Sequence, residues 1–281
     1  MMEMLIFMAA PFTACLVLIG MRGYLGQHVL KREIIFIDIS LAQIATLGAT
    51  AGFILGIDLH SGFVTFFSLG AVAFAAFVFA FARYSCRMVP QEAVIGVSYA
   101  VATMAAIIMI DKAAGGHEHI REMLSGSILW VHWEQVGWSA AVFSLVGLFH
   151  FFYRDRFNRL SLDYDRARSE GMRVRLWDFF FYLSFGVVMI YAVQIAGILL
   201  VFSFLIIPAT ISILLAQNWG SRIGLAWAVG AVVSLIGLVL SWKMDLQSGP
   251  TIVCLLGAAL LIVMLVRRII LSRKERVIHQ Y

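Results

Sequence analysis

Charged residues are scarce in this sequence. Asp, Glu, Lys and Arg make up 13% of its 281 residues, against roughly 25% in soluble domains. Hydrophobic residues make up 62%, and the mean hydropathy of +0.93 excludes a water-soluble globule. The three cysteines, Cys15, Cys86 and Cys254, are far apart and lie in or beside apolar runs. We interpret them as packing residues and not as a disulfide framework or metal knuckle.

The motifs of soluble enzymes are also missing. The sequence has no G-x-x-x-x-G-K-[ST] loop for binding ATP, no G-x-S-x-G nucleophile turn and no H-E-x-x-H zinc helix. No two catalytic groups sit at a working spacing on opposed apolar runs, which argues against an intramembrane enzyme. The chain is therefore expected not to be an enzyme.

Long apolar runs dominate instead. A membrane-spanning helix needs about 20 mostly apolar residues. Candidate spans are 4–29, 34–56, 62–82, 92–110, 136–152, 178–196, 198–216, 222–242 and 250–267. They predict an all-α, polytopic membrane bundle of about eight or nine helices. The number is open because Gly197 and Pro208 interrupt a run too long for one span.

The basic residues gather on one side of these spans. Seven arginines lie in the central polar loop, 153–178, and assigning the gaps alternately places 17 Lys and Arg residues on its side and 3 on the other. Because cytoplasmic loops are enriched in Lys and Arg, the loop and the C-terminus are predicted to be cytoplasmic. Nine crossings would put the N-terminus outside, and eight would put it inside. The net charge of +5 is thereby explained without a nucleic-acid partner.

Polar residues inside a span are the first candidates for a transport path, since charge at membrane depth is costly. Asp38 and Gln43 begin the second span and, five residues apart, point about 140° away from each other on a helix. They could line one wet groove. Alternatively, Asp38 caps the helix in cytoplasmic water and Gln43 bonds to a neighbouring helix.

Possible metal ligands lie on the outer side. Imidazole and carboxylate groups suit zinc, manganese or iron, and an external metal-capture rim is predicted at Asp58, His60, His117, Glu118 and His119. The alternative is a solvated polar loop in 111–135. Two further histidines, His28 and His150, sit singly at span ends and are expected to be interfacial.

Two other segments suggest moving parts. Gly197 and Pro208 in GILLVFSFLIIPA would let a helix bend, although a merely kinked structural helix fits equally well. In the central loop, 162–171 reads as a short helix begun by Asp163 or Asp165 and ended by Gly171. This helix either docks a soluble partner or lies on anionic membrane lipid through the neighbouring arginines.

Several stretches together resemble the permease subunits of bacterial ABC transporters for zinc, manganese and iron. They are LKREIIFID, QEAVIGVSYAVATM, EMLSGSILWV, LDYDRARSEGM, GILLVFSFLIIPATISILLA and SGPTIV. Their order and spacing cover nearly the whole chain. The resemblance implies a single transmembrane permease domain, 1–281, in the bacterial inner membrane.

The resemblance also implies partners. It predicts a homodimer of permeases with two cytoplasmic ATPase subunits and an extracytoplasmic metal-binding protein. ATP would bind only to the ATPase subunits, and the permease would hold no permanent cofactor beyond the transported ion. By match, coupling to the ATPase falls on Asp163, Asp165, Ala167 and Gly171.

One departure from the family pattern concerns the path. The family's second span commonly reads G-D-A-L-S-H-A-A-L-P-G, with Asp and His four residues apart on one face. Alignment through Gly48 places Gln43 at the histidine, Ile39 at the aspartate and Asp38 one place early. Glutamine is a poor zinc ligand, so the paired metal contact does not carry over. We hypothesise that the histidines of the outer loop compensate.

These observations favour a permease that imports a divalent transition metal by alternating access, with zinc as the first choice and manganese and iron close behind. The alternative is a standalone secondary transporter in which the central loop only joins two halves. Paired broken helices would favour that alternative, and the sequence shows one convincing break.

Overall fold

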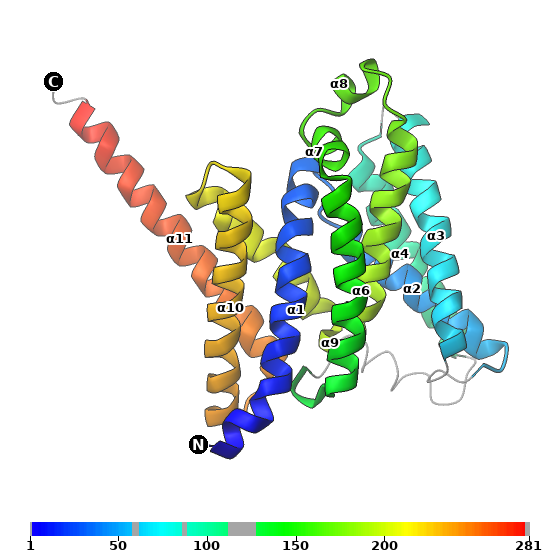
Figure 1. The fold of residues 1–281 in the computed structure, drawn as a ribbon, viewed down its shortest axis with the longest axis horizontal. Helices are drawn as coiled ribbons and strands as arrows, with labels where there is room; N and C mark the ends of the chain where they lie inside the picture. Colours follow the sequence, from blue (N-terminus) through cyan, green and yellow to red (C-terminus); the bar gives the residue numbers. More distant parts are fainter. Residues whose placement is uncertain (1, 58–61, 86–88, 112–127, 279–281) are drawn as a thin grey trace.

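All regular structure in the computed structural model, within the residues it describes (2–57, 62–85, 89–111 and 128–278), is helical. This confirms the all-α fold class. The elements are α1 (Met2–Arg32), α2 (Ile37–Ile54), α3 (Gly62–Ser85), α4 (Gln91–Asp111), the 3-10 turn η1 (Ile128–Trp130), α6 (Trp133–Phe152), α7 (Arg154–Leu162), α8 (Tyr164–Ser169), α9 (Val174–Leu215), α10 (Trp219–Met244) and α11 (Ser248–Ile278) (Figure 1).

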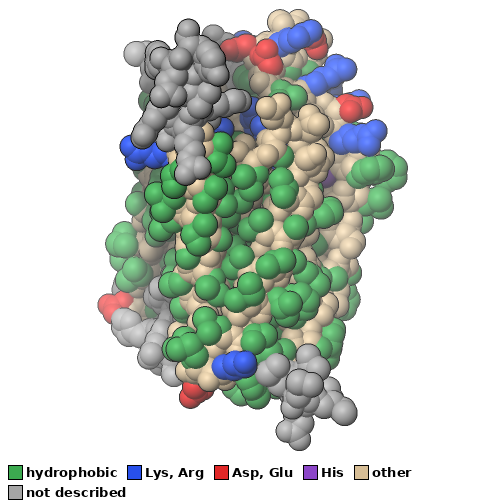
Figure 2. All heavy atoms as spheres, turned by 90° about the vertical axis from the view of Figure 1, so that its left-hand side faces the viewer, with side chains coloured by type: hydrophobic (Ala, Val, Ile, Leu, Met, Phe, Trp, Pro, Cys, Tyr) green, Lys and Arg blue, Asp and Glu red, His purple; other side chains and the backbone are tan. Residues whose placement is uncertain are grey.

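Eight of the described helices are long and apolar enough to cross a membrane. Their apolar side chains cover the outside of the bundle as well as its core, which is typical of helices in lipid. Figure 2 shows one such face, with hydrophobic side chains across its middle and charged side chains toward its two ends. The segments α7 and α8 lie at one end of the bundle, and the N-terminus lies at the other (Figure 1).

The longest helix, α9, is broken at Gly197. This residue has φ 72° and ψ 162°, a backbone conformation that is essentially restricted to glycine, inside an otherwise helical run of 42 residues. The second interruption expected from the sequence, Pro208, lies within the helix after the break.

Contacts with α1 show that α9 folds back at this break. Near its start, Asp178 accepts a hydrogen bond from Arg32 at 2.9 Å; near its end, Ser212 accepts one from Gln27 at 2.8 Å. A straight helix would separate residues 178 and 212 by about 51 Å, whereas residues 27 and 32 are only about 7.5 Å apart along α1. Both ends of α9 therefore lie at the same end of the bundle. With its two arms counted separately, the eight long helices of the described residues pass along the bundle nine times.

The folded-back helix is the centre of the bundle. It packs against α1, α2, α3, α6, α10 and α11. At one of these crossings the chains approach closely: a Cβ atom added to Gly26 would lie 2.2 Å from the carbonyl oxygen of Leu205. Only glycine permits this contact, so α1 is seated tightly on the second arm.

Candidate functional site

Asp38 is fully buried and forms an ion pair with Arg22 of α1. The helix α2 begins at Ile37 with Phe36 as its N-cap, and Asp38 sits in its first turn. The alternative of a carboxylate capping the helix in water therefore does not describe this structure. Gln43 is also buried, at 7% exposure, farther along the same helix.

The pairing of Asp38 with Arg22 was not predicted from the sequence. The Arg22 guanidinium also donates to the sulfur of Met189 on the first arm of α9, and it lies 5.4 Å from the centre of the Phe185 ring. Arg22 thus joins α1, α2 and α9 in the interior of the bundle.

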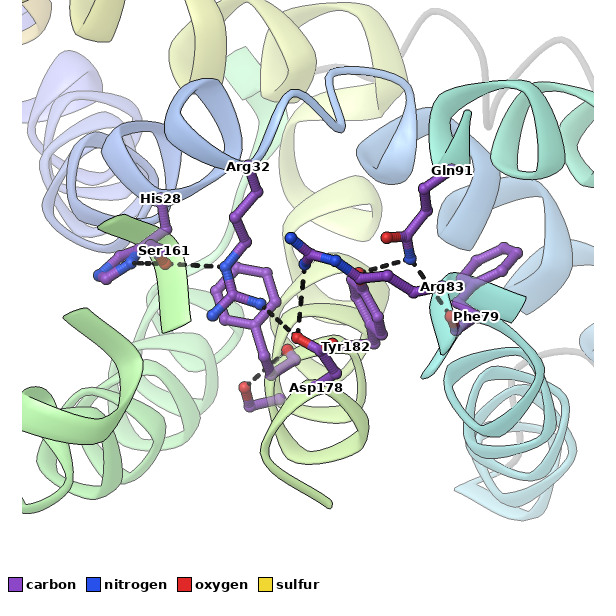
Figure 3. Close-up of polar contacts among 10 residues, drawn as sticks. His28, Arg32, Phe79, Arg83, Gln91, Ser161, Asp178 and Tyr182 are labelled. Atoms are coloured by element: carbon purple, nitrogen blue, oxygen red, sulfur yellow. Dashed lines mark hydrogen bonds and ion pairs between the residues drawn. The ribbon is translucent and has the colours of Figure 1, made fainter. Parts of the chain in front are cut away.

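A second buried charge cluster lies where α1 and α3 end and α9 begins (Figure 3). The carboxylate of Asp178 accepts a hydrogen bond from Arg32 at 2.9 Å and forms an ion pair with Arg83 at 3.5 Å. The side chains of Asp178 and Arg32 are fully buried, and that of Arg83 is 16% exposed. The sequence analysis used the basic residues only to assign the sides of the membrane, whereas the structure shows that Arg32 and Arg83 also join three helices.

This cluster reaches α7 through Ser161. The Ser161 hydroxyl accepts a hydrogen bond from Arg32 Nε and pairs with His28 Nδ1, both at 2.8 Å (Figure 3). The other histidine expected at an interface, His150, pairs with Ser184 at 2.8 Å. Both histidines are buried, so the expectation that they are interfacial was wrong. Inside the bundle, each histidine pairs with a serine hydroxyl through one ring nitrogen.

The same cluster reaches α8 through Tyr164. The Arg83 guanidinium lies 4.3 Å from the centre of the Tyr164 ring, a cation–π contact. Burial raises the pKa of the Tyr164 phenol, and the nearby carboxylate of Asp178 adds to the rise. Tyr164 therefore stays neutral at physiological pH. On α9, Tyr182 accepts a hydrogen bond from Gln91 of α4 at 2.7 Å (Figure 3).

The short helix expected in the central loop is present as α8, and it is shorter than predicted. Asp163 is its N-cap and accepts a hydrogen bond from the Arg166 amide at 3.0 Å. After the helix, Gly171 turns the chain with φ 81°. Asp165 is exposed in the first turn, and Ala167 packs into the core at 2% exposure. A hollow of about 330 Å³ runs beside the helix and is lined by Arg159, Leu162, Asp163, Arg166, Ala167 and Glu170.

The helix α7 was not expected. Its buried positions, Phe157, Leu160 and Ser161, recur at helical spacing, so the signal was in the sequence beneath the arginines that surround it. The helices α7 and α8 together form a projection between α6 and α9 at one end of the bundle.

The predicted outer rim lies outside the described residues. This applies to Asp58, His60, His117, Glu118 and His119. Within the described part of the chain, no group of three or more His, Cys, Asp or Glu side chains is arranged to hold a metal ion.

The chain is similar in sequence to membrane transport proteins of one family. Residues 4–267 match the model of the ABC 3 transport family. The chain is 28% identical to the manganese transport system membrane protein MntC of Listeria innocua, over 82% of this chain and 80% of that one. It is 24% identical to the manganese import system permease protein ScaB of Streptococcus gordonii, over 82% and 81%.

A solved structure, PsaBC from Streptococcus pneumoniae in complex with Fab, superposes with a TM-score of 0.74. The two chains are 22% identical, and the match covers 92% of this chain and 90% of that one. This similarity supports the fold.

Proposed function

Because the chain belongs to the ABC 3 transport family, we propose that it is the permease subunit of an ATP-driven importer of divalent transition metal ions. The observation that carries the proposal is the family match over residues 4–267, joined to a helical projection held by buried ion pairs at one end of the bundle. Such a projection is what a separate, soluble energy-supplying partner needs.

Manganese is the first candidate for the transported ion. The zinc preference inferred from the sequence depended on outer-loop histidines, whereas relatives from two genera are named for manganese. The interior groups favour the same choice, since the carboxylate of Asp38 and the amide of Gln43 offer oxygen atoms, which suit manganese better than zinc. Zinc and iron are the competitors to be tested.

The partners follow from the proposed role. Two copies of this chain would form the path, two cytoplasmic ATPase subunits would hydrolyse ATP, and an extracytoplasmic metal-binding protein would deliver the ion. The helix α8 would meet the ATPase through the segment that holds Asp163, Asp165, Ala167 and Gly171. Arg83 of α3 contacts the Tyr164 ring of α8 and pairs with Asp178 of α9. A displacement of α8 by the ATPase would therefore be transmitted to α3 and α9.

The path would run past Asp38 and Gln43, and the break at Gly197, with Pro208 beyond it, would let the second arm of α9 tilt. The α7–α8 end and the C-terminus would face the cytoplasm across the bacterial inner membrane. On the other side, the metal-capture rim is proposed at Asp58, His60, His117, Glu118 and His119.

The function is tested by reconstituting the permease with its ATPase in vesicles that enclose the binding protein, with the ATPase facing the bath. The binding protein is loaded with ⁵⁴Mn²⁺, and the appearance of the metal outside is followed. We expect release that needs ATP and falls to background when the Walker lysine of the ATPase is replaced by alanine. Unlabelled Mn²⁺ loaded with the tracer should compete more strongly than Zn²⁺ or Fe²⁺. Movement of metal without ATP or the ATPase would instead identify a secondary transporter.

A further inference from the structure

Arg22 is a charged side chain buried near the middle of the membrane. It lies ten residues before the end of α1, about 15 Å along the helix, which is half of a hydrocarbon core of about 30 Å. Its side chain is fully buried, as is that of Asp38. A charge kept at this depth usually serves a path for ions or protons.

The two buried carboxylates among the described residues differ in how they are neutralised. Asp178 has two arginines, Arg32 and Arg83, at the end of the bundle. Asp38 has one, Arg22. In both carboxylates the second oxygen makes no hydrogen bond to the described residues, so the difference lies in the number of arginines. The negative charge of Asp38 is therefore balanced by one removable cation.

Two side chains beside the guanidinium of Arg22 can hold it when it is not paired with Asp38. It touches the Met189 sulfur and faces the Phe185 ring, both on the first arm of α9, and its Nε atom makes no hydrogen bond to the described residues. The Met189 sulfur and the Phe185 ring therefore offer the guanidinium of Arg22 a polarisable surface to contact when it turns away from the Asp38 carboxylate.

We propose that Arg22 is a tethered counter-ion that occupies the place beside Asp38 where a transported divalent cation would bind. This inference rests on the proposed function. A guanidinium and a divalent cation repel each other strongly at low dielectric, and one carboxylate cannot neutralise both. Metal therefore reaches Asp38 only in a conformation in which Arg22 has turned away, and the return of Arg22 displaces the ion. Arg22 sets when the site is open.

The test counts bound metal in the absence of ATP. The permease–ATPase complex is purified in lipid nanodiscs, and Mn²⁺ binding is measured by equilibrium dialysis, with free Mn²⁺ quantified by electron paramagnetic resonance. Arg22→Met should bind one more Mn²⁺ per permease chain than the wild type. The Kd of Mn²⁺ at this site should be at least tenfold lower than its Kd at the same site in the wild type. Adding Asp38→Asn should abolish the extra site.

Two further variants make the result specific. Arg22→Lys keeps a cation on the tether and should bind no extra Mn²⁺. Arg32→Met also removes a buried arginine, but it leaves Asp178 paired with Arg83 and should not gain a site. If Arg22→Met does not yield a monodisperse complex, Arg22→Gln is used with the same expectation.

Folded Arg22 variants that bind no more Mn²⁺ than the wild type would overturn the inference and leave Arg22 as a structural partner of Asp38. Extra binding that survives Asp38→Asn would overturn it as well. Because binding is read without ATP, these outcomes are separate from a failure of the proposed function, which would appear as wild-type vesicles that do not move metal with ATP.

Discussion

Asp178, whose side chain is fully buried, neutralises the two guanidinium groups of Arg32 and Arg83. A buried pair is costly to form, and removing one partner costs more than the pair contributes, because the remaining charge has no compensation. The arrangement therefore specifies which helix ends meet.

Replacing Asp178 with asparagine tests this at the residue scale. The change keeps the shape of the side chain but leaves Arg32 and Arg83 without a counter-charge. We expect the free energy of unfolding to fall by about 3–5 kcal/mol, as measured by denaturant titration in micelles. The control is Asp155→Asn on α7, whose side chain is 84% exposed and whose loss should change stability by less than about 0.5 kcal/mol. Equal stability of the two variants would contradict this role.

At the scale of elements, the reversal of α9 depends on one residue. Gly197 adopts a backbone conformation that side chains with a Cβ atom avoid. Because both ends of α9 are fastened to the last turns of α1, straightening the break would pull at least one of these contacts apart.

Gly197→Ala is therefore expected to lower the free energy of unfolding by about 1–3 kcal/mol and to reduce ATP-driven manganese transport. The matched control is Gly257→Ala in α11, where a Cβ atom would meet open space and alanine favours the helix by up to about 1 kcal/mol. Denaturant titration and the vesicle assay measure both effects. Full stability and transport in Gly197→Ala would show that the break is not needed.

The elements could be predicted from the sequence far better than their contacts. Apolar runs located the spans, and Asp163 and Gly171 located α8, because these signals are local. The fold-back of α9 was left open, since Gly197 marks a break but not its direction. The ion pairs were missed for a similar reason. Arg32 and Asp178 are separated by 146 positions in the sequence, and no local pattern records which charges meet.

For the whole molecule, the fold-back gives the described helices an odd number of passes, so α1 begins and α11 finishes at opposite ends of the bundle (Figure 1). The turn between α10 and α11 lies at the end opposite α7 (Figure 1). The excess of Lys and Arg near α7 predicts that this end faces the cytoplasm.

Cysteine labelling checks this orientation. In a background with the natural cysteines replaced by serine, Asp245→Cys should react with a membrane-impermeant maleimide in intact spheroplasts. Asp155→Cys should react only after the membrane is opened. Labelling of both positions in sealed cells would contradict nine passes with a cytoplasmic α7.

The pairing of charges also has a consequence for biosynthesis. A chain enters the membrane from its N-terminus onward, and an unpaired charged side chain within a spanning segment opposes insertion. Arg22 precedes Asp38 in the chain, and both Arg32 and Arg83 precede Asp178. Each buried aspartate therefore emerges from the ribosome after the arginine that neutralises it. The counter-charge is already present in the chain when the aspartate enters the membrane.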